Sequence, residues 1–156
     1  MKKVLMCYGN GGHKEQSCRL VSLFDSSYDN VIFLSLTDNG TKPNWSKAHL
    51  EVGEMRDKYT GSFPSPFKVI KNFFEIRRFL KKNNVINIVS FGPGVSVLTY
   101  LSSFGIAENF YHFETWSKFS SLSITSKILA KLGCHIFYQN KELSSLINNG
   151  TYVGRL

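Results

Sequence analysis

The chain has 156 residues, of which 42% are apolar and 19% charged, so it is long enough for one domain with a buried core and short for a two-domain enzyme. Its 19 Lys and Arg residues against 11 Asp and Glu give a net charge of +8, which favours anionic partners such as nucleic acid, anionic lipid or phosphorylated substrates. Its three cysteines follow neither a disulfide framework nor a metal-site spacing. We therefore predict a single domain over residues 1–156, with reduced thiols in its core and no metal.

Two apolar stretches bear on targeting and membrane insertion. The first ends at Gly9, which makes it too short for a signal peptide. The second, residues 83–107, carries no charge and has the length of a membrane span. Gly92-Pro93-Gly94 interrupts it, together with several serines, so we predict a buried strand, a turn and a helix there. We expect no transmembrane helix.

Strands and helices alternate from the start of the chain. Apolar, β-branched runs predict strands at residues 3–8 ("KVLMCY") and 30–36 ("NVIFLSL"), with a helix between them over residues 14–24. A stretch rich in turn residues follows, and a short strand is expected at residues 50–52. This order predicts that the chain crosses over between its first two strands through a helix.

The clearest helix lies in residues 65–84, "SPFKVIKNFFEIRRFLKKNN". Ser65 can cap it, Pro66 suits its first turn, and Lys81 and Lys82 sit favourably at its carboxyl end. From residue 68 to residue 82 it holds six basic residues and one acid, which is +5 of the net charge of +8.

The apolar residues of this basic helix exceed one ordinary buried stripe. Its remaining aromatic residues and lysines can contact a membrane that contains anionic lipid, each cation contributing about 1 kcal/mol. A core helix with a solvated charged face explains the same pattern, and the residues alone leave both explanations open. Nucleic acid is a less favoured partner, because no recognised nucleic-acid motif is present.

The second half of the chain continues the alternation. It contains three predicted strands, three helices and a terminal segment of strand character. In chain order, these are a strand at 85–91, a helix at 94–105, a strand at 109–114, a helix at 121–133, a strand at 134–139, a short helix at 141–150 and the terminal segment 151–154.

Strands that alternate with helices predict a Rossmann-like α/β fold, with a parallel sheet covered by helices on both faces. In such sheets ligands bind where the carboxyl ends of the strands meet the loops. Three of these loops carry unusual residues: residues 9–13 ("GNGGH"), residues 92–96 ("GPGVS") and residues 112–118 ("HFETWSK"). We expect all three to lie along one edge of the sheet.

The two glycine loops each precede a predicted helix. Such a loop presents backbone N–H groups and the positive end of the helix dipole, which suits a phosphate or pyrophosphate. Glycines that only permit a tight turn are the alternative, and two such loops on one edge favour anion binding. Lys14 stands where the third glycine of a dinucleotide fingerprint belongs, and no Gly-Lys-Ser/Thr follows. A nicotinamide or ATP site is therefore disfavoured, and we expect no cofactor.

Three side chains in these loops are candidates for chemistry. His13 has an ordinary pKa near neutrality, which suits a general base, but it can equally bond a neighbouring loop. Glu114 ends an apolar strand, where it can orient or deprotonate a sugar hydroxyl or make a structural bond to the following loop. Lys118 can neutralise a phosphate or be a solvated loop lysine. The residues alone do not decide between these roles.

The segments "GNGGHKEQ", "IVSFGPGVS", "HFETWSKFSSLSITSKIL", "FYQNKELSSL" and "TYVGRL" together resemble a known family in their order and spacing. The chain is similar to the acceptor-binding subunit of the two-subunit UDP-N-acetylglucosamine transferase of dolichol-linked glycan assembly. It is more similar still to the bacterial PssD-type relatives of that subunit, which act in capsule and exopolysaccharide synthesis. The likeness spans nearly the whole chain.

The resemblance implies the amino-terminal half of an inverting GT-B glycosyltransferase that transfers a sugar from a UDP-sugar to a polyprenyl-pyrophosphate-linked sugar. It implies a partner chain that carries the donor site, a lipid-linked sugar acceptor, and a cytoplasmic location on the inner face of the membrane. The acceptor side of the cleft would hold His13 and Glu114 as catalytic residues. The substrate-binding residues would be Gly11, Gly12, Gly92, Pro93, Gly94, Thr115 and Lys118, without a metal.

The chain departs from the family pattern at four positions. Thr115 stands where the family usually has Ser, and Lys118 stands where it has Arg; lysine keeps the charge but loses the bidentate fork. Ser126 replaces a usual glycine, and Asn140 replaces a frequent Trp. Two rival functions are a non-catalytic scaffold that recruits a catalytic glycosyltransferase chain to the membrane, and a free-standing nucleotide-binding or redox domain.

Overall fold

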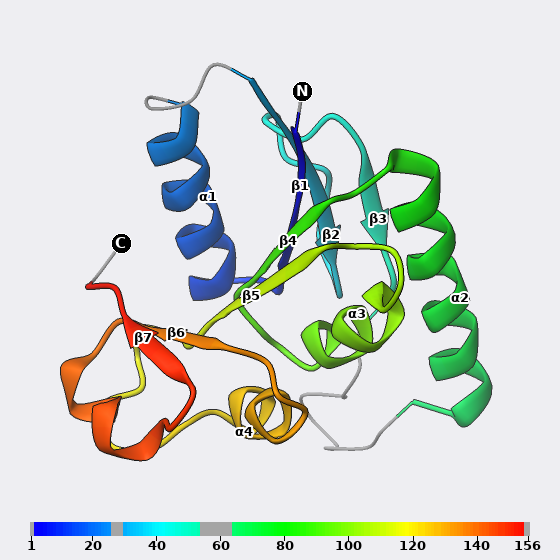
Figure 1. Ribbon diagram of the computed structural model, residues 1–156. Coiled ribbons are helices and arrows are strands. Elements are labelled where there is room, and N and C mark those ends of the chain that lie inside the picture. The colour runs from blue at the N-terminus through cyan, green and yellow to red at the C-terminus, as the bar shows by residue number, and fades with distance from the viewer. Residues whose placement is uncertain (1, 26–29, 54–63, 155–156) are drawn as a thin grey trace.

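The computed structural model describes residues 2–25, 30–53 and 64–154 (Figure 1). Seven strands form one sheet in the order β3-β2-β1-β4-β5-β6-β7, and neighbouring strands run parallel throughout the described residues. The central order 3-2-1-4-5 is that of a Rossmann sheet, which confirms the predicted fold class. The strands are β1 (Lys2–Tyr8), β2 (Val31–Thr37), β3 (His49–Glu51), β4 (Asn87–Ser90), β5 (Asn109–Phe113), β6 (Ile136–Tyr138) and β7 (Gly150–Tyr152).

Helices cover both faces of this sheet. In Figure 1 α1 lies on one side of the central strands and α2 and α3 lie on the other. The helices are α1 (Gly12–Asp25), α2 (Pro66–Asn83), α3 (Val95–Ser103) and α4 (Ile124–Lys131), and a short 3-10 helix, η1 (Lys141–Leu146), precedes β7. The uncharged stretch 83–107 thus forms β4, a turn and α3, as predicted. The described residues contain no helix long and apolar enough to cross a membrane.

The alternation of side chains along β1 divides the core into two layers. Leu5 and Cys7 face α2 and α3, whereas Val4, Met6 and Tyr8 face α1. A third cluster, which includes Leu129, Ile136 and Leu143, fills the space between β6, α4 and η1. Central parallel strands are buried on both faces, and this explains why "VLMCY" reads as a continuous apolar run.

The cysteines are free, as the sequence predicted. Cys7 lies in β1, whereas Cys134 precedes β6. Burial raises the pKa of the Cys7 thiol to about 12 and that of Cys134 to about 11. Both thiols are therefore protonated near pH 7, which is the less nucleophilic form of cysteine.

Helix α2 begins and ends as its sequence predicts. The Ser65 side chain accepts a hydrogen bond from the backbone N–H of Lys68 at 3.4 Å, and Asn84 ends the helix in the left-handed conformation with φ 51°. The buried stripe of the helix contains Asn72, whose side-chain amide donates to the carbonyl of Val52 at 2.8 Å, and the fully buried Ile76. This stripe holds α2 against the sheet, while the other face of the helix stays in solvent.

Two isoleucines of α2 test this packing directly. Ile76 is fully buried and Ile70 is 55% exposed, so both Ile→Ala changes alter helix propensity equally but only one opens a cavity. We expect Ile76→Ala to lower the free energy of unfolding by about 2–4 kcal/mol and Ile70→Ala by less than about 0.5 kcal/mol. Urea unfolding followed by circular dichroism measures both, and equal losses would contradict the assigned burial.

Candidate active site at the carboxyl edge of the sheet

The three unusual loops do meet at one edge of the sheet. They follow β1, β4 and β5, which are neighbouring parallel strands, so that their carboxyl ends lie side by side. We call this edge the rim and define it as residues 9–13, 92–94 and 114–118. The sequence prediction that these loops gather on one edge is therefore confirmed.

The two glycine loops are in direct contact. A Cβ on Gly9 would lie 2.6 Å from Cδ of Pro93, so only glycine fits at this position. A Cβ on Gly92 would lie 3.5 Å from Cε1 of His13, and Gly92 has a φ of +75°, which favours glycine. Gly11 adopts a φ of +73° and brings the chain into α1. These glycines therefore serve both a tight turn and the close approach of a side-chain ring, that of Pro93 on Gly9 and that of His13 on Gly92.

His13 lies in the first turn of α1 and is half-buried. Its ring sits against Gly92, and its charge acts on His112 near the end of β5. The structure thus brings His13, the loop 92–94 and the end of β5 together. An imidazole at this place lies beside the N–H groups that begin α1, where an anionic group would bind.

The carboxylate of Glu114 is turned into the protein. Glu114 is 1% exposed, and its Oε1 accepts the backbone N–H of Thr115 at 2.8 Å while its Oε2 accepts that of Ser123 at 2.7 Å. Both oxygens thereby hold the loop between β5 and α4. These contacts agree with the structural alternative considered for this residue, and its catalytic role stays a prediction.

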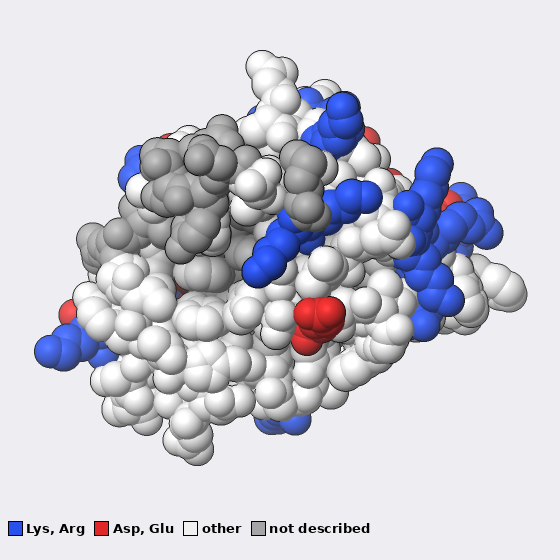
Figure 2. Space-filling view, turned by 45° about the horizontal axis from the view of Figure 1, so that its top comes forward, with Lys and Arg blue, Asp and Glu red and all other residues white. Residues whose placement is uncertain are grey.

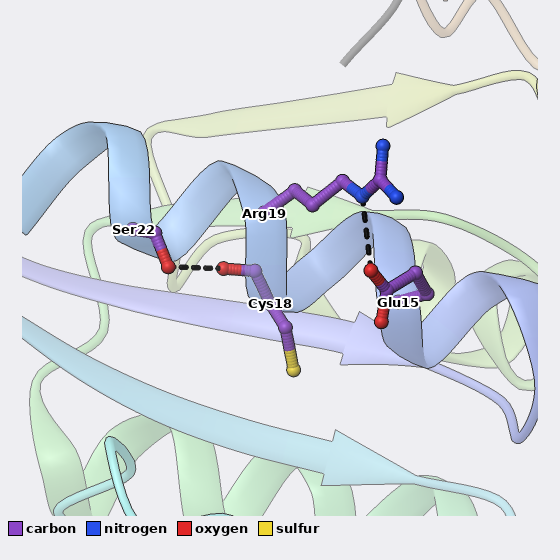
Figure 3. A network of polar contacts seen from close by, with 4 residues as sticks. All are labelled: Glu15, Cys18, Arg19 and Ser22. Carbon is purple, nitrogen blue, oxygen red and sulfur yellow. Dashed lines mark hydrogen bonds and ion pairs between the residues drawn. The ribbon is translucent and has the colours of Figure 1, made fainter.

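Trp116 lies over the start of α1. Its indole nitrogen would be 3.7 Å from a Cβ on Gly12, and the guanidinium of Arg19 lies 5.0 Å from the centre of its ring. Figure 3 shows Arg19 on α1, where its Nε donates to Glu15 at 2.9 Å. The Trp116 loop is thus stacked on α1 through a cation–π contact, which contributes on the order of 0.5–1 kcal/mol at an exposed site.

An open groove runs along the outer face of α1, lined by Glu15, Cys18, Arg19, Ser22 and Leu23. In Figure 3 the Ser22 hydroxyl points to the carbonyl of Cys18, to which it donates at 3.0 Å. None of these five residues was predicted to bind substrate, and this groove is not the rim.

The end of β6 contributes two residues that sequence reasoning did not assign to the site. The side-chain amide of Asn140 donates to the carbonyls of Trp116 at 2.7 Å and Lys118 at 2.6 Å. That of Gln139 donates to the carbonyl of Glu114 at 3.3 Å. Both amides are buried and fix the backbone of residues 114–118. The only sequence signal was their position at the end of a strand next to β5.

The two remaining predicted residues, Thr115 and Lys118, share this fixed loop. The Thr115 hydroxyl lies 3.2 Å from that of Ser117, and the Thr115 carbonyl accepts the backbone N–H of Lys118 at 3.1 Å. The loop therefore makes a tight turn. Lys118 is half-buried in it and carries the positive charge of the rim loop after β5.

No protein-family model and no curated protein matches this chain. Among solved structures, the crystal structure of MurG from Acinetobacter baumannii matches over the whole of this chain with a TM-score of 0.69 and 17% sequence identity. The chain spans only 44% of the length of MurG. The likeness shows the fold: a Rossmann-like unit that corresponds to one half of a GT-B glycosyltransferase.

The two hydrogen bonds that the Glu114 carboxylate accepts from backbone N–H groups predict that this residue stabilises the fold. Glu114→Gln places a side-chain NH2 against a backbone N–H, so we expect the free energy of unfolding to fall by about 1–3 kcal/mol at pH 7. Glu142→Gln, at an exposed acid in η1, is the matched control and is expected to change it by less than about 0.5 kcal/mol. Denaturant titration of both variants checks this, and equal stabilities would show that the Glu114 bonds contribute nothing.

Proposed function

We propose that this chain is the acceptor-binding half of an inverting glycosyltransferase that acts on a polyprenyl-pyrophosphate-linked sugar with a UDP-sugar donor. The single observation that carries the proposal is the rim, where two glycine loops and His13 meet at the carboxyl edge of a Rossmann-like sheet. The fold shared with one half of MurG and the family resemblance of the sequence support the same reaction class.

The rim has the groups that a diphosphate needs. Gly11 and Gly12 stand at the start of α1 and Gly92 to Gly94 precede α3, so the N-termini of both helices, with the positive ends of their dipoles, lie at the carboxyl edge of the sheet. Lys118 adds a cation from the third loop. We propose that these residues bind the pyrophosphate of the acceptor and neutralise its charge through protein groups.

His13 is the proposed general base. It would take the proton of the acceptor hydroxyl as the oxygen attacks the anomeric carbon of the donor sugar. The new glycosidic C–O bond forms while the bond between that carbon and the UDP oxygen breaks, and UDP leaves with the electron pair. Attack from the face opposite the leaving group inverts the anomeric centre. Glu114 would hold the loop 114–118 for this step.

We propose that the donor half is carried by a separate partner chain, in capsule, exopolysaccharide or O-antigen synthesis. The family resemblance is the support for this arrangement, because its members divide the acceptor and donor halves between two polypeptides. The donor nucleotide would lie across the cleft from the rim. The nature of the sugar would then depend on the partner rather than on the residues described here.

We further propose that the helix layer formed by α2, α3 and α4 faces an anionic membrane from the cytoplasmic side. On α2, Phe67, Ile70 and Phe74 are 86%, 55% and 60% exposed, at spacings that form one stripe. Lys71 and Arg78 continue the same helical face and are exposed. Apolar side chains beside cations are the pattern of a surface that binds anionic lipid.

Exposed apolar side chains beside basic ones also occur on the neighbouring helices. Arg77 ties α2 to the end of α3 by donating to the carbonyls of Ser102 at 3.0 Å and Phe104 at 2.9 Å. On α4, Ile124 and Ile128 are exposed, beside the exposed Lys127. Figure 2 shows Lys and Arg side chains gathered at the right, the side on which α2 lies in Figure 1.

The reaction is tested with the full chain co-expressed with a candidate donor-binding partner chain, using radiolabelled UDP-sugars and a polyprenyl-pyrophosphate sugar. We expect His13→Gln to lower kcat at least about a hundredfold, because general-base catalysis contributes about 10²–10⁴. His135→Gln, at a histidine near the opposite end of the sheet, should keep the activity. Unchanged turnover in His13→Gln would support the recruiting scaffold instead.

Membrane binding is tested by sedimentation with vesicles that contain phosphatidylglycerol. Phe67→Ser with Phe74→Ser should weaken binding at least about tenfold, since burying one aromatic side chain contributes about 1.5–3 kcal/mol. Leu23→Ser, at a residue of α1 that is 54% exposed, is the control and should bind as the unchanged chain does. Equal binding by both variants would place the membrane contact elsewhere.

A further inference from the structure

A buried histidine joins three elements beneath the rim. His112, near the end of β5, is 1% exposed. Its Nδ1 lies 3.1 Å from Oγ of Ser90, the last residue of β4, and its Nε2 lies 2.9 Å from Oγ of Ser126 in the first turn of α4. One imidazole thus connects β4, β5 and α4 where the rim loops leave the sheet.

Each ring nitrogen of His112 is paired with a serine hydroxyl. The hydroxyl of Ser123 donates to Oγ of Ser126 at 3.1 Å, and Oγ of Ser126 lies within hydrogen-bond distance of Nε2 of His112. A neutral imidazole donates from one nitrogen and accepts at the other, so the ring can bond Ser90 and Ser126 at the same time. Burial, aided by the charge of His13, lowers the pKa of His112 to about 3, so the ring stays neutral near pH 7.

The chain of bonds continues from Ser126 to the loop that follows β5. The Ser123 side chain caps α4 by accepting the backbone N–H of Ser126 at 3.1 Å. The Ser123 backbone N–H donates to the carboxylate of Glu114, which also holds Thr115. A shift of α4 relative to β5 would therefore move residues 114–118 relative to the two glycine loops.

We propose that His112 is a positioning residue, which fixes the start of α4 and the loop 114–118 against the glycine loops and thereby sets the diphosphate affinity of the rim. This inference rests on the proposed function. His112 does not touch the substrate; it acts through Ser126, Ser123 and Glu114.

The test uses the full chain and inorganic pyrophosphate as the probe, titrated by calorimetry. Ser126→Ala removes the hydroxyl with little change in volume and keeps a good helix former. We expect the Kd for pyrophosphate to rise about fivefold or more, the scale of one lost buried hydrogen bond. His112→Gln, whose side-chain amide has both a donor and an acceptor to offer to the Ser126 hydroxyl, is the conservative variant and should weaken binding less than Ser126→Ala.

His135 provides a matched control. Its Nδ1 lies 2.8 Å from Asn149 Oδ1 and its Nε2 lies 2.9 Å from Thr151 Oγ1, so it also bridges two side chains. It precedes β6, at the opposite edge of the sheet from the rim. His135→Gln should leave the pyrophosphate Kd within about twofold, because it breaks bonds of the same kind away from the site.

Amide hydrogen exchange of the free protein supplies a second readout. In Ser126→Ala the amides of Ser123 and Thr115 should exchange about tenfold faster, and in His135→Gln they should not change. Faster exchange with an unchanged pyrophosphate Kd would overturn the proposal and leave His112 a structural residue only. Unchanged exchange would also overturn it. Failure of the unaltered chain to bind pyrophosphate would instead refute the diphosphate site of the proposed function, and this inference with it.

Discussion

The ring of Pro93 occupies the space in which any residue other than glycine at position 9 would place its Cβ. That Cβ would lie 2.6 Å from Cδ and 2.9 Å from Cγ of Pro93, closer than non-bonded atoms approach. The end of β1 and the loop after β4 therefore meet backbone against ring, and the same approach sets His13 against Gly92. The rim is one continuous surface because the Pro93 ring packs directly on the backbone of Gly9 and the His13 ring on that of Gly92. The glycines that weaken local structure make this contact possible.

Most of the fold could be predicted from the sequence, because its signals are local. The alternation of apolar runs and amphipathic segments implies parallel strands, and the Ser65 and Pro66 signals mark the start of α2 where the structure has it. The short elements were predicted less well. The predicted helix over residues 141–150 is the 3-10 helix η1 followed by β7, because these few residues are organised by packing against β6 rather than by their own periodicity.

The site could be predicted only in its position. Parallel strands bring their carboxyl ends together whatever the side chains, so the meeting of the three loops followed from the fold. The direction in which a side chain points cannot be derived from the fold in this way. Glu114 ends an apolar strand and was equally compatible with a cleft or with a bond to its own loop; the amides of Thr115 and Ser123 take both of its oxygens. The role of Asn140 could not be derived from its position at the end of a strand, because its partners are the carbonyls of residues 22 and 24 positions away.

The proposed membrane surface and the rim are mechanically connected through α4. The outer face of this helix carries the exposed Ile124 and Ile128, and its first turn is bonded to Glu114 through Ser123. A bilayer that contacts α2 and α4 would therefore touch the same helix, α4, that also fixes the loop 114–118. The proposed substrate, a lipid-linked diphosphate, would lie at the level of the headgroups, so its binding site would have to be held at a constant height above the surface that rests on the lipid. Hydrogen bonds between buried groups provide that rigidity, because each one that breaks leaves a polar atom without water. In the proposed function, the buried polar groups behind the rim, His112 among them, would serve this purpose better than an apolar core of the same volume, since they fix direction as well as distance.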